Sequence, residues 1–300
     1  MSKLPIIAAA GAVAVALSGW FWYQSLDYDA PAMAVYPIID AAGEHVGDYH
    51  PPQARDILAE ENADEIIYGM RLLNETARLL PSNVGNGLNC NSCHMAQGKR
   101  PLGAPYINTV EDYPKFMPRS QAVTDLAERI NGCFRRSMNG QPLPVESAEM
   151  EAMQAYMGWL AKDLKPGQRV EIDNMEYFNV GQYTPDPERG GHIYAQQCAA
   201  CHGSNGEGMQ DQFGDYIFPP LWGEESFNIG AGMARLSRAA PFVRHNMPLG
   251  VSLDAPLGQI VLSQQDAVDV SAYFTVKPRP DFPDKIYDWP GVPKPADFRD

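Results

Sequence analysis

The stretch Cys90-Asn91-Ser92-Cys93-His94 has two cysteines separated by two residues, with a histidine directly after the second one. This spacing is the attachment signature of c-type haem: each thiol adds to one vinyl group, and the histidine ligates the iron. The same pattern returns at Cys198-Ala199-Ala200-Cys201-His202. A zinc site would need four ligands without a histidine beside each second cysteine, and a redox dithiol would need a βαβ context. We therefore predict two covalently bound haem c groups, each attached through its two cysteines and ligated by its histidine.

Helical periodicity surrounds both motifs. Apolar residues recur at spacings of three, four and seven across residues 54–80, just before the first motif. Further helices are predicted over 124–138, 147–161 and 263–276, and Ser263 is a suitable N-cap for the last of them. A helix, a short loop and then the motif is the opening of a class I cytochrome c domain. The expected fold class is all-α, with two class I cytochrome c-like domains in tandem, preceded by one N-terminal transmembrane helix.

Composition divides the 300 residues into six segments. In chain order we expect a membrane anchor or uncleaved signal at 1–24, a tether at 25–53, a first cytochrome c domain at 54–164, a linker at 165–188, a second cytochrome c domain at 189–276, and a proline-rich tail at 277–300. The second domain opens with Arg189-Gly190-Gly191-His192-Ile193-Tyr194. A glycine and an aromatic residue there let the last helix of a cytochrome c cross closely. The tail has six prolines, which exclude a helix or central strand, so we expect it to wrap the surface.

The N-terminal apolar run from Leu4 to Tyr23 has the length of a membrane helix, about 20 residues. It ends in Trp20-Phe21-Trp22-Tyr23, an aromatic cluster typical of the membrane interface. A cleaved signal peptide is the alternative, with a cleavage site near Ala16-Leu17-Ser18. We favour an uncleaved anchor, which puts the haem domains on the periplasmic face of the cytoplasmic membrane. Cleavage would instead give a soluble periplasmic protein.

The formal net charge of −14 excludes nucleic acid as a partner. An acidic surface suits docking to a basic redox partner. It is a poor overall field for an anionic substrate, so such a substrate would need a local cluster of arginines.

The iron of the second haem needs a sixth ligand, and Met247 is the best candidate. It precedes Pro248 in a loop ahead of the final helix, where class I cytochromes present a thioether to iron. A thioether raises the reduction potential and suits electron transfer. The alternative is that Met247 only fills the core, with Met209, Met233 or His245 as the ligand.

The first haem lacks an equivalent motif, because Met117-Pro118 comes too soon after the attachment site. Between that site and the closing helix lies Cys133, the fifth and only unassigned cysteine. On a helix, Arg129, Cys133 and Ser137 stack along one line at i, i+4 and i+8, and Arg136, three residues after Cys133, flanks that line. A lone cysteine on an apolar helix face is usually buried and inert. Beside a haem without a distal ligand, and among arginines that favour the thiolate, it instead indicates a site for an anionic sulfur compound.

Two segments resemble the thiosulfate dehydrogenase (tetrathionate synthase) family of dihaem cytochromes c. They are Gly87-Leu88-Asn89-Cys90-Asn91-Ser92-Cys93-His94, and residues 129–140 with the following Gln141-Pro142-Leu143-Pro144. The resemblance extends roughly from residue 86 to the final helix. It implies the following ligands and site residues: His94 and Cys133 on the iron of the first, catalytic haem, His202 and Met247 on the second, electron-transfer haem, and Arg119, Arg129 and Ser137 lining the substrate site. Some members have a lysine before the methionine; here it is Asn246, which argues against ligand exchange.

The resemblance further implies oxidation of two thiosulfates to tetrathionate, or the reverse reaction, with a cytochrome or a quinol-linked protein as redox partner. One alternative is a membrane-anchored dihaem electron-transfer subunit of a respiratory complex, without substrate chemistry of its own. Another is a structural or assembly subunit, favoured by the small residues Ala10, Ala14 and Ser18 on one face of the apolar run and by the long tail.

Overall fold

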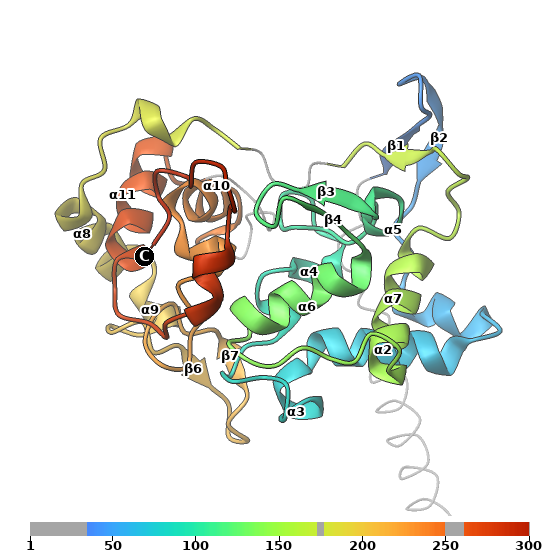
Figure 1. Cartoon of the computed structure of the whole chain (residues 1–300), viewed down its shortest axis with the longest axis horizontal. Coiled ribbons are helices and arrows are strands. Elements are labelled where there is room, and N and C mark those ends of the chain that lie inside the picture. The colour runs from blue at the N-terminus through green and yellow to red at the C-terminus, as the bar shows by residue number, and fades with distance from the viewer. Residues whose placement is uncertain (1–34, 173–176, 250–260, 300) are drawn as a thin grey trace, which may run out of the picture. The chain divides into compact units, whose positions relative to one another are not determined.

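The computed structural model describes residues 35–172, 177–249 and 261–299. Its helices form two groups, each around its own hydrophobic core (Figure 1). The first group comprises η1 Ala54–Ala59, α2 Ala63–Asn74, α3 Thr76–Leu79, η2 Cys90–Ser92, α4 Met95–Gly98, α5 Thr109–Asp112, α6 Leu126–Arg136 and α7 Ala148–Leu160. The second comprises η3 Val180–Gln182, α8 Pro187–Gln197, α9 Ala199–His202, η4 Gly232–Ala234, α10 Leu236–Asn246 and α11 Gln264–Thr275. The predicted helices are thus present, with the segment 54–80 divided into three.

The first domain is organised by the crossing of α2 and α7. Gly69 on α2 makes the close approach possible, because a Cβ atom built there would lie 1.8 Å from the carbonyl oxygen of Ala152. Around this crossing α7 buries Met150, Met153 and Tyr156, each exposed by no more than 1%. The crossing therefore anchors the apolar core against which the first haem motif and α6 pack.

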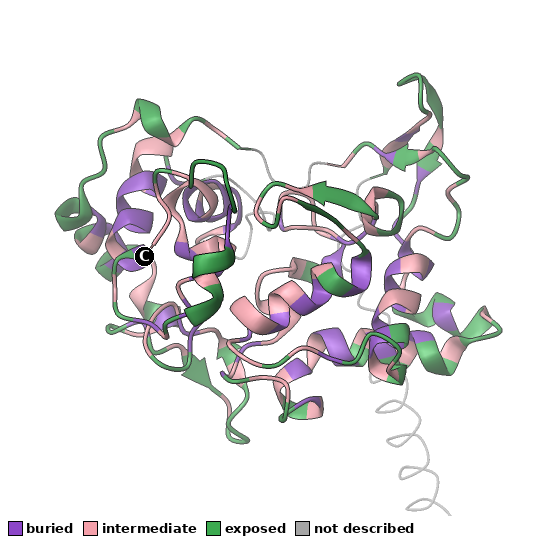
Figure 2. Ribbon diagram, viewed as in Figure 1, coloured by how far each residue is buried: buried purple, intermediate pink, exposed green. Residues whose placement is uncertain are grey.

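The second domain repeats this arrangement with α8 and α11. A Cβ atom at Gly190 would lie 1.9 Å from the carbonyl oxygen of Asp269, and Tyr194 is buried one turn further along α8. The predicted glycine and aromatic residue thus lie at the helix crossing. Figure 2 shows buried residues along α10 and α11, consistent with a core that includes Val243, Val270 and Phe274.

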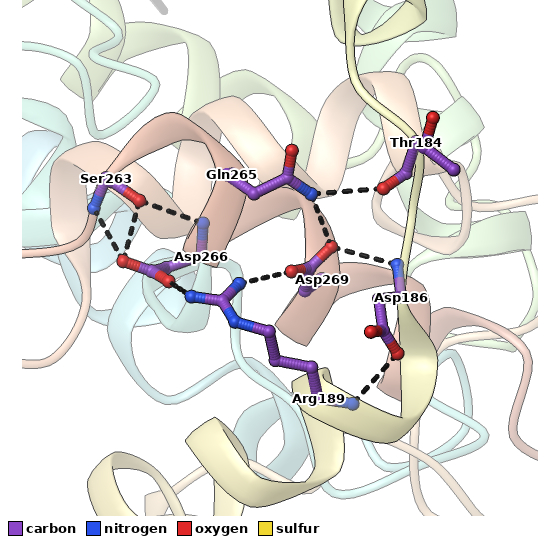
Figure 3. A network of polar contacts seen from close by, with 7 residues as sticks. All are labelled: Thr184, Asp186, Arg189, Ser263, Gln265, Asp266 and Asp269. Carbon is purple, nitrogen blue, oxygen red and sulfur yellow. Dashed lines mark hydrogen bonds and ion pairs between the residues drawn. The ribbon is translucent and has the colours of Figure 1, made fainter.

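A polar network fastens the ends of α8 and α11 (Figure 3). Asp269, only 1% exposed, accepts hydrogen bonds from the backbone N–H of Asp186 at 2.9 Å and from Gln265 Nε2 at 2.7 Å. Arg189 on α8 pairs with both Asp266 and Asp269 on α11. Ser263 caps α11 as predicted, since its hydroxyl accepts the N–H of Asp266 at 3.1 Å.

Short strands depart from the all-α prediction. β1 Tyr36–Ile39 lies between β2 His45–Tyr49 and β5 Arg169–Val170, and both pairings are antiparallel. Two further hairpins are formed by β3 Lys115–Met117 with β4 Ala122–Thr124 and by β6 Met209–Gln210 with β7 Tyr216–Phe218. These strands have two to five residues and too little alternation to be recognised from sequence. Residues 36–49, part of the predicted tether, therefore add a sheet to the first domain.

The transmembrane helix in the predicted fold class also needs correction. Within residues 35–172, 177–249 and 261–299, no helix is long and apolar enough to cross a membrane. The longest of these helices, α7, has 13 residues. At about 1.5 Å per residue it spans about 20 Å, against a bilayer core of about 30 Å. The predicted anchor at 1–24 lies outside the described residues. The fold is corrected to two helical domains with short strands, without a membrane-spanning helix in the described part.

The C-terminal half of the chain also contributes to the first domain. Phe227, Ala231 and Ala234 belong to the first hydrophobic core, although they follow the second haem motif in sequence. After α11 the tail forms η5 Pro283–Tyr287 and then contacts Arg119 and Arg136 of the first domain. This packing brings two segments of the C-terminal half to the region around α6.

Candidate functional site

Both histidines of the haem motifs are oriented in the same way. His94 Nδ1 lies 2.6 Å from the carbonyl oxygen of Ala104, and His202 Nδ1 lies 2.8 Å from that of Pro219. A carbonyl accepts only from a protonated nitrogen, so Nδ1 donates and Nε2 keeps its lone pair for a metal. Burial also lowers the pKa of His202, which favours the neutral, ligating form. The structure therefore fits histidine ligation of iron at both motifs.

None of the attachment cysteines takes part in a disulfide. Burial raises the pKa of both Cys90 and Cys93 to about 12, and burial raises that of Cys198 to about 11. Neutral thiols of this kind are poor zinc ligands and poor redox nucleophiles. They remain suited to thioether formation with a haem, and both motifs thus fit covalently attached haem c.

Met247 directly follows α10, where its N–H donates to the carbonyl of Val243 at 2.9 Å. Its side chain is partly buried and packs against the second core. Among the alternatives, Met209 is exposed, whereas Met233 packs against both cores. Asn246 is buried, and its amide donates to the carbonyl of Leu102 in the first domain at 2.9 Å. Met247 therefore stays the predicted ligand of the second iron.

Cys133 lies on α6 between two polar groups. Arg129, one turn earlier, donates from Nη1 to the sulfur at 2.9 Å, and His94 is within hydrogen-bonding reach of the same sulfur. Burial raises the pKa of the Cys133 thiol, but Arg129 and His94 outweigh this effect and lower the pKa to about 6. Arg129 and His94 thus favour the thiolate form of Cys133. Its charge also contributes to the raised pKa of Cys90 and Cys93, so the attachment cysteines lie near Cys133.

The sequence of α6 explains this placement. Asp125 caps the helix by accepting the N–H of Glu128 at 2.8 Å, and Leu126, Ile130 and Phe134 face the core. At the other end, the amide of Asn86 donates to the Ser137 carbonyl at 2.9 Å.

The helix thereby carries Arg129, Cys133 and Ser137 on successive turns, as predicted. Ser137 is half-buried at the C-terminal cap.

Arg119 approaches this region from the turn between β3 and β4. Its Nη1 donates to the carbonyl of Gly230 at 2.6 Å, and its guanidinium stacks on Trp289 at 4.8 Å. Burial lowers the pKa of Arg119 to about 10; Asp288 opposes this shift, whereas Arg136, Arg235 and Arg129 add to it. These charges are therefore close together, and they form an arginine cluster of Arg119, Arg129, Arg136 and Arg235.

Sequence reasoning missed several members of this site. Arg136 was not among them, because its spacing of three residues from Cys133 predicted that it flanks the cysteine. Arg235, Asp288 and Trp289 gave no such signal, because the second domain and the tail bring them to α6 over more than a hundred residues. Together with the thiolate, the cluster can bind and orient a small sulfur oxyanion.

Comparisons with known proteins agree with this geometry. The family model "SoxA/TsdA, cytochrome c domain" matches residues 82–165, and "Cytochrome C oxidase, cbb3-type, subunit III" matches residues 185–273. The chain is 39% identical to the thiosulfate dehydrogenase of Psychrobacter arcticus, over 83% of this chain and 73% of that protein. It is likewise 39% identical to the thiosulfate dehydrogenase of Stutzerimonas stutzeri, over 81% and 77% of the two chains.

A solved structure is also similar: thiosulfate dehydrogenase TsdBA from Marichromatium purpuratum, in the as-isolated form. The TM-score is 0.68 at 35% identity, over 78% of this chain and 50% of that chain, so this chain spans about half of its length. The predictions of an oxidoreductase and of two covalently bound haem c groups are confirmed by these relatives and by the two matched cytochrome c domains. The chain therefore belongs to the thiosulfate dehydrogenase family of cytochromes c.

Proposed function

We propose that this protein oxidises two thiosulfate ions to tetrathionate in the periplasm, in a reaction that also runs in reverse. The observation that carries the proposal is the contact of Arg129 with the Cys133 sulfur at 2.9 Å, beside His94 and within a cluster of arginines. A thiolate held in this way is a nucleophile, and the arginines are suited to the oxyanion end of thiosulfate. The relatives named thiosulfate dehydrogenase support this choice of substrate.

Four residues would hold the two irons. We assign His94 and Cys133 to the first haem and His202 and Met247 to the second. When bound there, the haems would supply one-electron acceptors for the two electrons released from thiosulfate. The chain's own residues bind the substrate and form the sulfur–sulfur bond.

The first step joins Cys133 to substrate. The Cys133 thiolate and the outer sulfur of one thiosulfate form a disulfide-like bond, which gives a cysteine S-thiosulfonate and releases two electrons. In the second step another thiosulfate attacks the outer sulfur of this adduct, as thiolates attack disulfides. Tetrathionate leaves and the Cys133 thiolate is restored, so atoms and charge balance.

The arginines make these two reaction steps possible by lowering the repulsion between anions. Arg129 stabilises the thiolate, and Arg119 is close enough to Arg129 to interact with it electrostatically. Two thiosulfate dianions would otherwise repel each other in a half-buried site. Ser137, one turn after Cys133, is assigned to the substrate-binding side of α6.

The test is thiosulfate-dependent reduction of an electron acceptor with tetrathionate quantified, for the native protein and Cys133→Ala at equal haem content. We expect turnover in the native protein and none in the variant, while a chemical reductant still reduces both haems of each. If neither protein turns over while the haems still cycle, the protein is an electron carrier. Activity that survives the substitution would exclude the role of Cys133.

A further inference from the structure

The C-terminal tail reaches the arginine cluster by a defined path. After α11 the carbonyl of Pro278 accepts the N–H of Gly223 at 2.8 Å, and that of Pro280 accepts the N–H of Ile229 at 3.0 Å. The tail then forms η5, drawn in red in Figure 1, and Asp288 directly after it contacts Arg136 of α6. The tail thus passes the candidate site, and its last described residues return to α10 and α11.

Asp288, directly after η5, is the charged residue that the tail delivers. Its side chain is 4% exposed; Oδ1 accepts from Arg136 Nη2 at 2.8 Å, and Oδ2 lies 3.8 Å from Arg119 Nη1. No described residue donates a hydrogen bond to Oδ2, because Arg119 Nη1 is directed to the Gly230 carbonyl instead. One buried carboxylate thus pairs with two arginines, and one of its oxygens accepts no hydrogen bond within the described part of the chain.

Trp289 fixes the carboxylate in this position. Its backbone N–H donates to the carbonyl of Arg119 at 2.6 Å. The guanidinium groups of Arg119 and Arg235 lie 4.8 and 5.4 Å from its ring centroid. Trp289 has a φ of 56°, a left-handed conformation that bulky residues rarely adopt. Such a conformation persists where the surroundings compensate for it, as they do at functional sites.

The charges of this region do not balance. Among the described residues, Arg119 and Arg136 share one carboxylate, Asp288, so two cations face a single anion. This excess positive charge is what a dianionic substrate requires. The carboxylate of Asp288 limits the size of that excess. A buried arginine without a counter-ion is costly, so the carboxylate also stabilises the site when it holds no anion.

We propose that Asp288 is a specificity-determining residue: the resident counter-ion of Arg119 and Arg136, which sets the excess positive charge that the site offers to a thiosulfate dianion. This inference rests on the proposed function for the identity of the substrate. The tail thereby forms one wall of the anion site on the first domain.

Removal of the charge at Asp288 has two consequences. The free site loses stability because Arg119 and Arg136 lose their counter-ion, whereas a bound anion replaces it. Anions therefore bind more tightly to Asp288→Asn, by about tenfold, the size of one hydrogen bond to a charged group. The product is also an anion, so both KM and kcat for thiosulfate fall in this variant.

The experiment uses the full-length, haem-loaded protein and sulfate as an unreactive dianion. Calorimetry gives the Kd for sulfate, and thermal unfolding is followed with and without it. For Asp288→Asn we expect a tighter Kd and a lower Tm that sulfate restores. Asp288→Glu keeps the charge and should approach the native Kd. The matched control is Asp284→Asn, an exposed carboxylate in the same tail, which should leave both quantities unchanged.

A double variant keeps the test decisive if Asp288→Asn fails to fold. Arg136→Gln alone should weaken sulfate binding about tenfold. Arg136→Gln with Asp288→Asn removes the pair as a unit and should bring the Kd back close to the native value. A double variant that binds as weakly as Arg136→Gln alone would overturn the proposal, as would an unchanged Kd in a folded Asp288→Asn protein.

Sulfate binding also separates this proposal from the proposed function. If the native protein forms no tetrathionate while the variants follow the expected binding pattern, the counter-ion role stands and the activity fails. If tetrathionate is formed normally while the binding pattern is absent, the activity stands and the role of Asp288 is excluded.

Discussion

The two domains share a scaffold and differ in what surrounds the predicted second ligand. In each, a glycine allows two helices to cross, at Gly69 and at Gly190, and a histidine of the haem motif donates Nδ1–H to a backbone carbonyl. Cys133 lies among charges, in contact with Arg129, whereas Met247 packs against an apolar core. One scaffold thus provides a charged site suited to substrate chemistry and an apolar site suited to electron transfer.

The difference arises from tertiary packing as much as from the ligands. The charged site is built by α6 together with the tail, which supplies Asp288, and with Gly230 from the C-terminal half. The apolar site is built from α10 and its neighbours within the second domain. A catalytic role for one cytochrome c domain therefore depends on segments recruited from outside that domain.

The largest expected effect comes from making the first site resemble the second. Cys133→Met offers a thioether, which cannot form the proposed sulfur–sulfur adduct. We expect tetrathionate formation to fall by about a thousandfold or more. The measurement is turnover at equal haem content.

Cys133→Ser serves as the size-matched control for this substitution. It should be as inactive as the methionine variant, because a serine hydroxyl also lacks the thiolate. Retained activity in the serine variant alone would mean that the larger side chain, rather than loss of the thiolate, causes the defect.

The next effect removes the charge beside the thiolate. Arg129→Gln loses a hydrogen bond to a charged group, worth about 1.5–3 kcal/mol, so kcat/KM should fall about 10- to 100-fold. The matched control is Arg135→Gln on the same helix, since Arg135 pairs with Glu128 near the surface. Steady-state kinetics of both variants test this prediction. Equal losses in the two would show that α6 simply needs its positive charge.

A smaller effect is expected at the two helix crossings. Gly69→Ala and Gly190→Ala each place a Cβ atom within 2 Å of a backbone oxygen, so the helices must separate. Overpacking of this kind costs about 1–3 kcal/mol. Gly158→Ala on α7 is the control, because nothing lies within 4 Å of its Cβ position, and it should not destabilise the protein. Thermal unfolding should therefore separate the two crossing variants from the control.

The smallest effect concerns acid. The Ser263 hydroxyl, followed by Arg189, holds the pKa of Asp266 below its ordinary value. Since the folded pKa lies below the unfolded one, the stabilisation is present at neutral pH and is lost as pH falls through the folded pKa, below about pH 4. Arg189→Gln should therefore lose less Tm on acidification than the native protein. Equal acid sensitivity would exclude this ion-pair network as a source of pH dependence.

Local patterns made much of the fold predictable. The helices before and after each motif follow from apolar spacing, and Ser263 caps its helix as its position indicated. The line of Arg129, Cys133 and Ser137 follows from helical geometry alone.

Long-range packing was not predictable in the same way. β1 pairs with β5 about 130 residues later, and Arg119 contacts Asp288 about 170 residues later. Short strands and a proline-rich tail have no periodicity that would indicate which distant residues they contact. The carboxylate in the arginine cluster therefore became visible only in three dimensions.

The contact between Arg136 and Asp288 spans 152 residues, so it forms only after both haem motifs and α11 have been synthesised. A shortened product that ends before Asp288 retains both haem motifs, Cys133 and the arginines, but lacks their counter-ion. By the proposal above, such a product carries its haems but binds oxyanions more tightly than the full-length protein. The counter-ion of the arginines is therefore in place only once the segment through Asp288 has been synthesised.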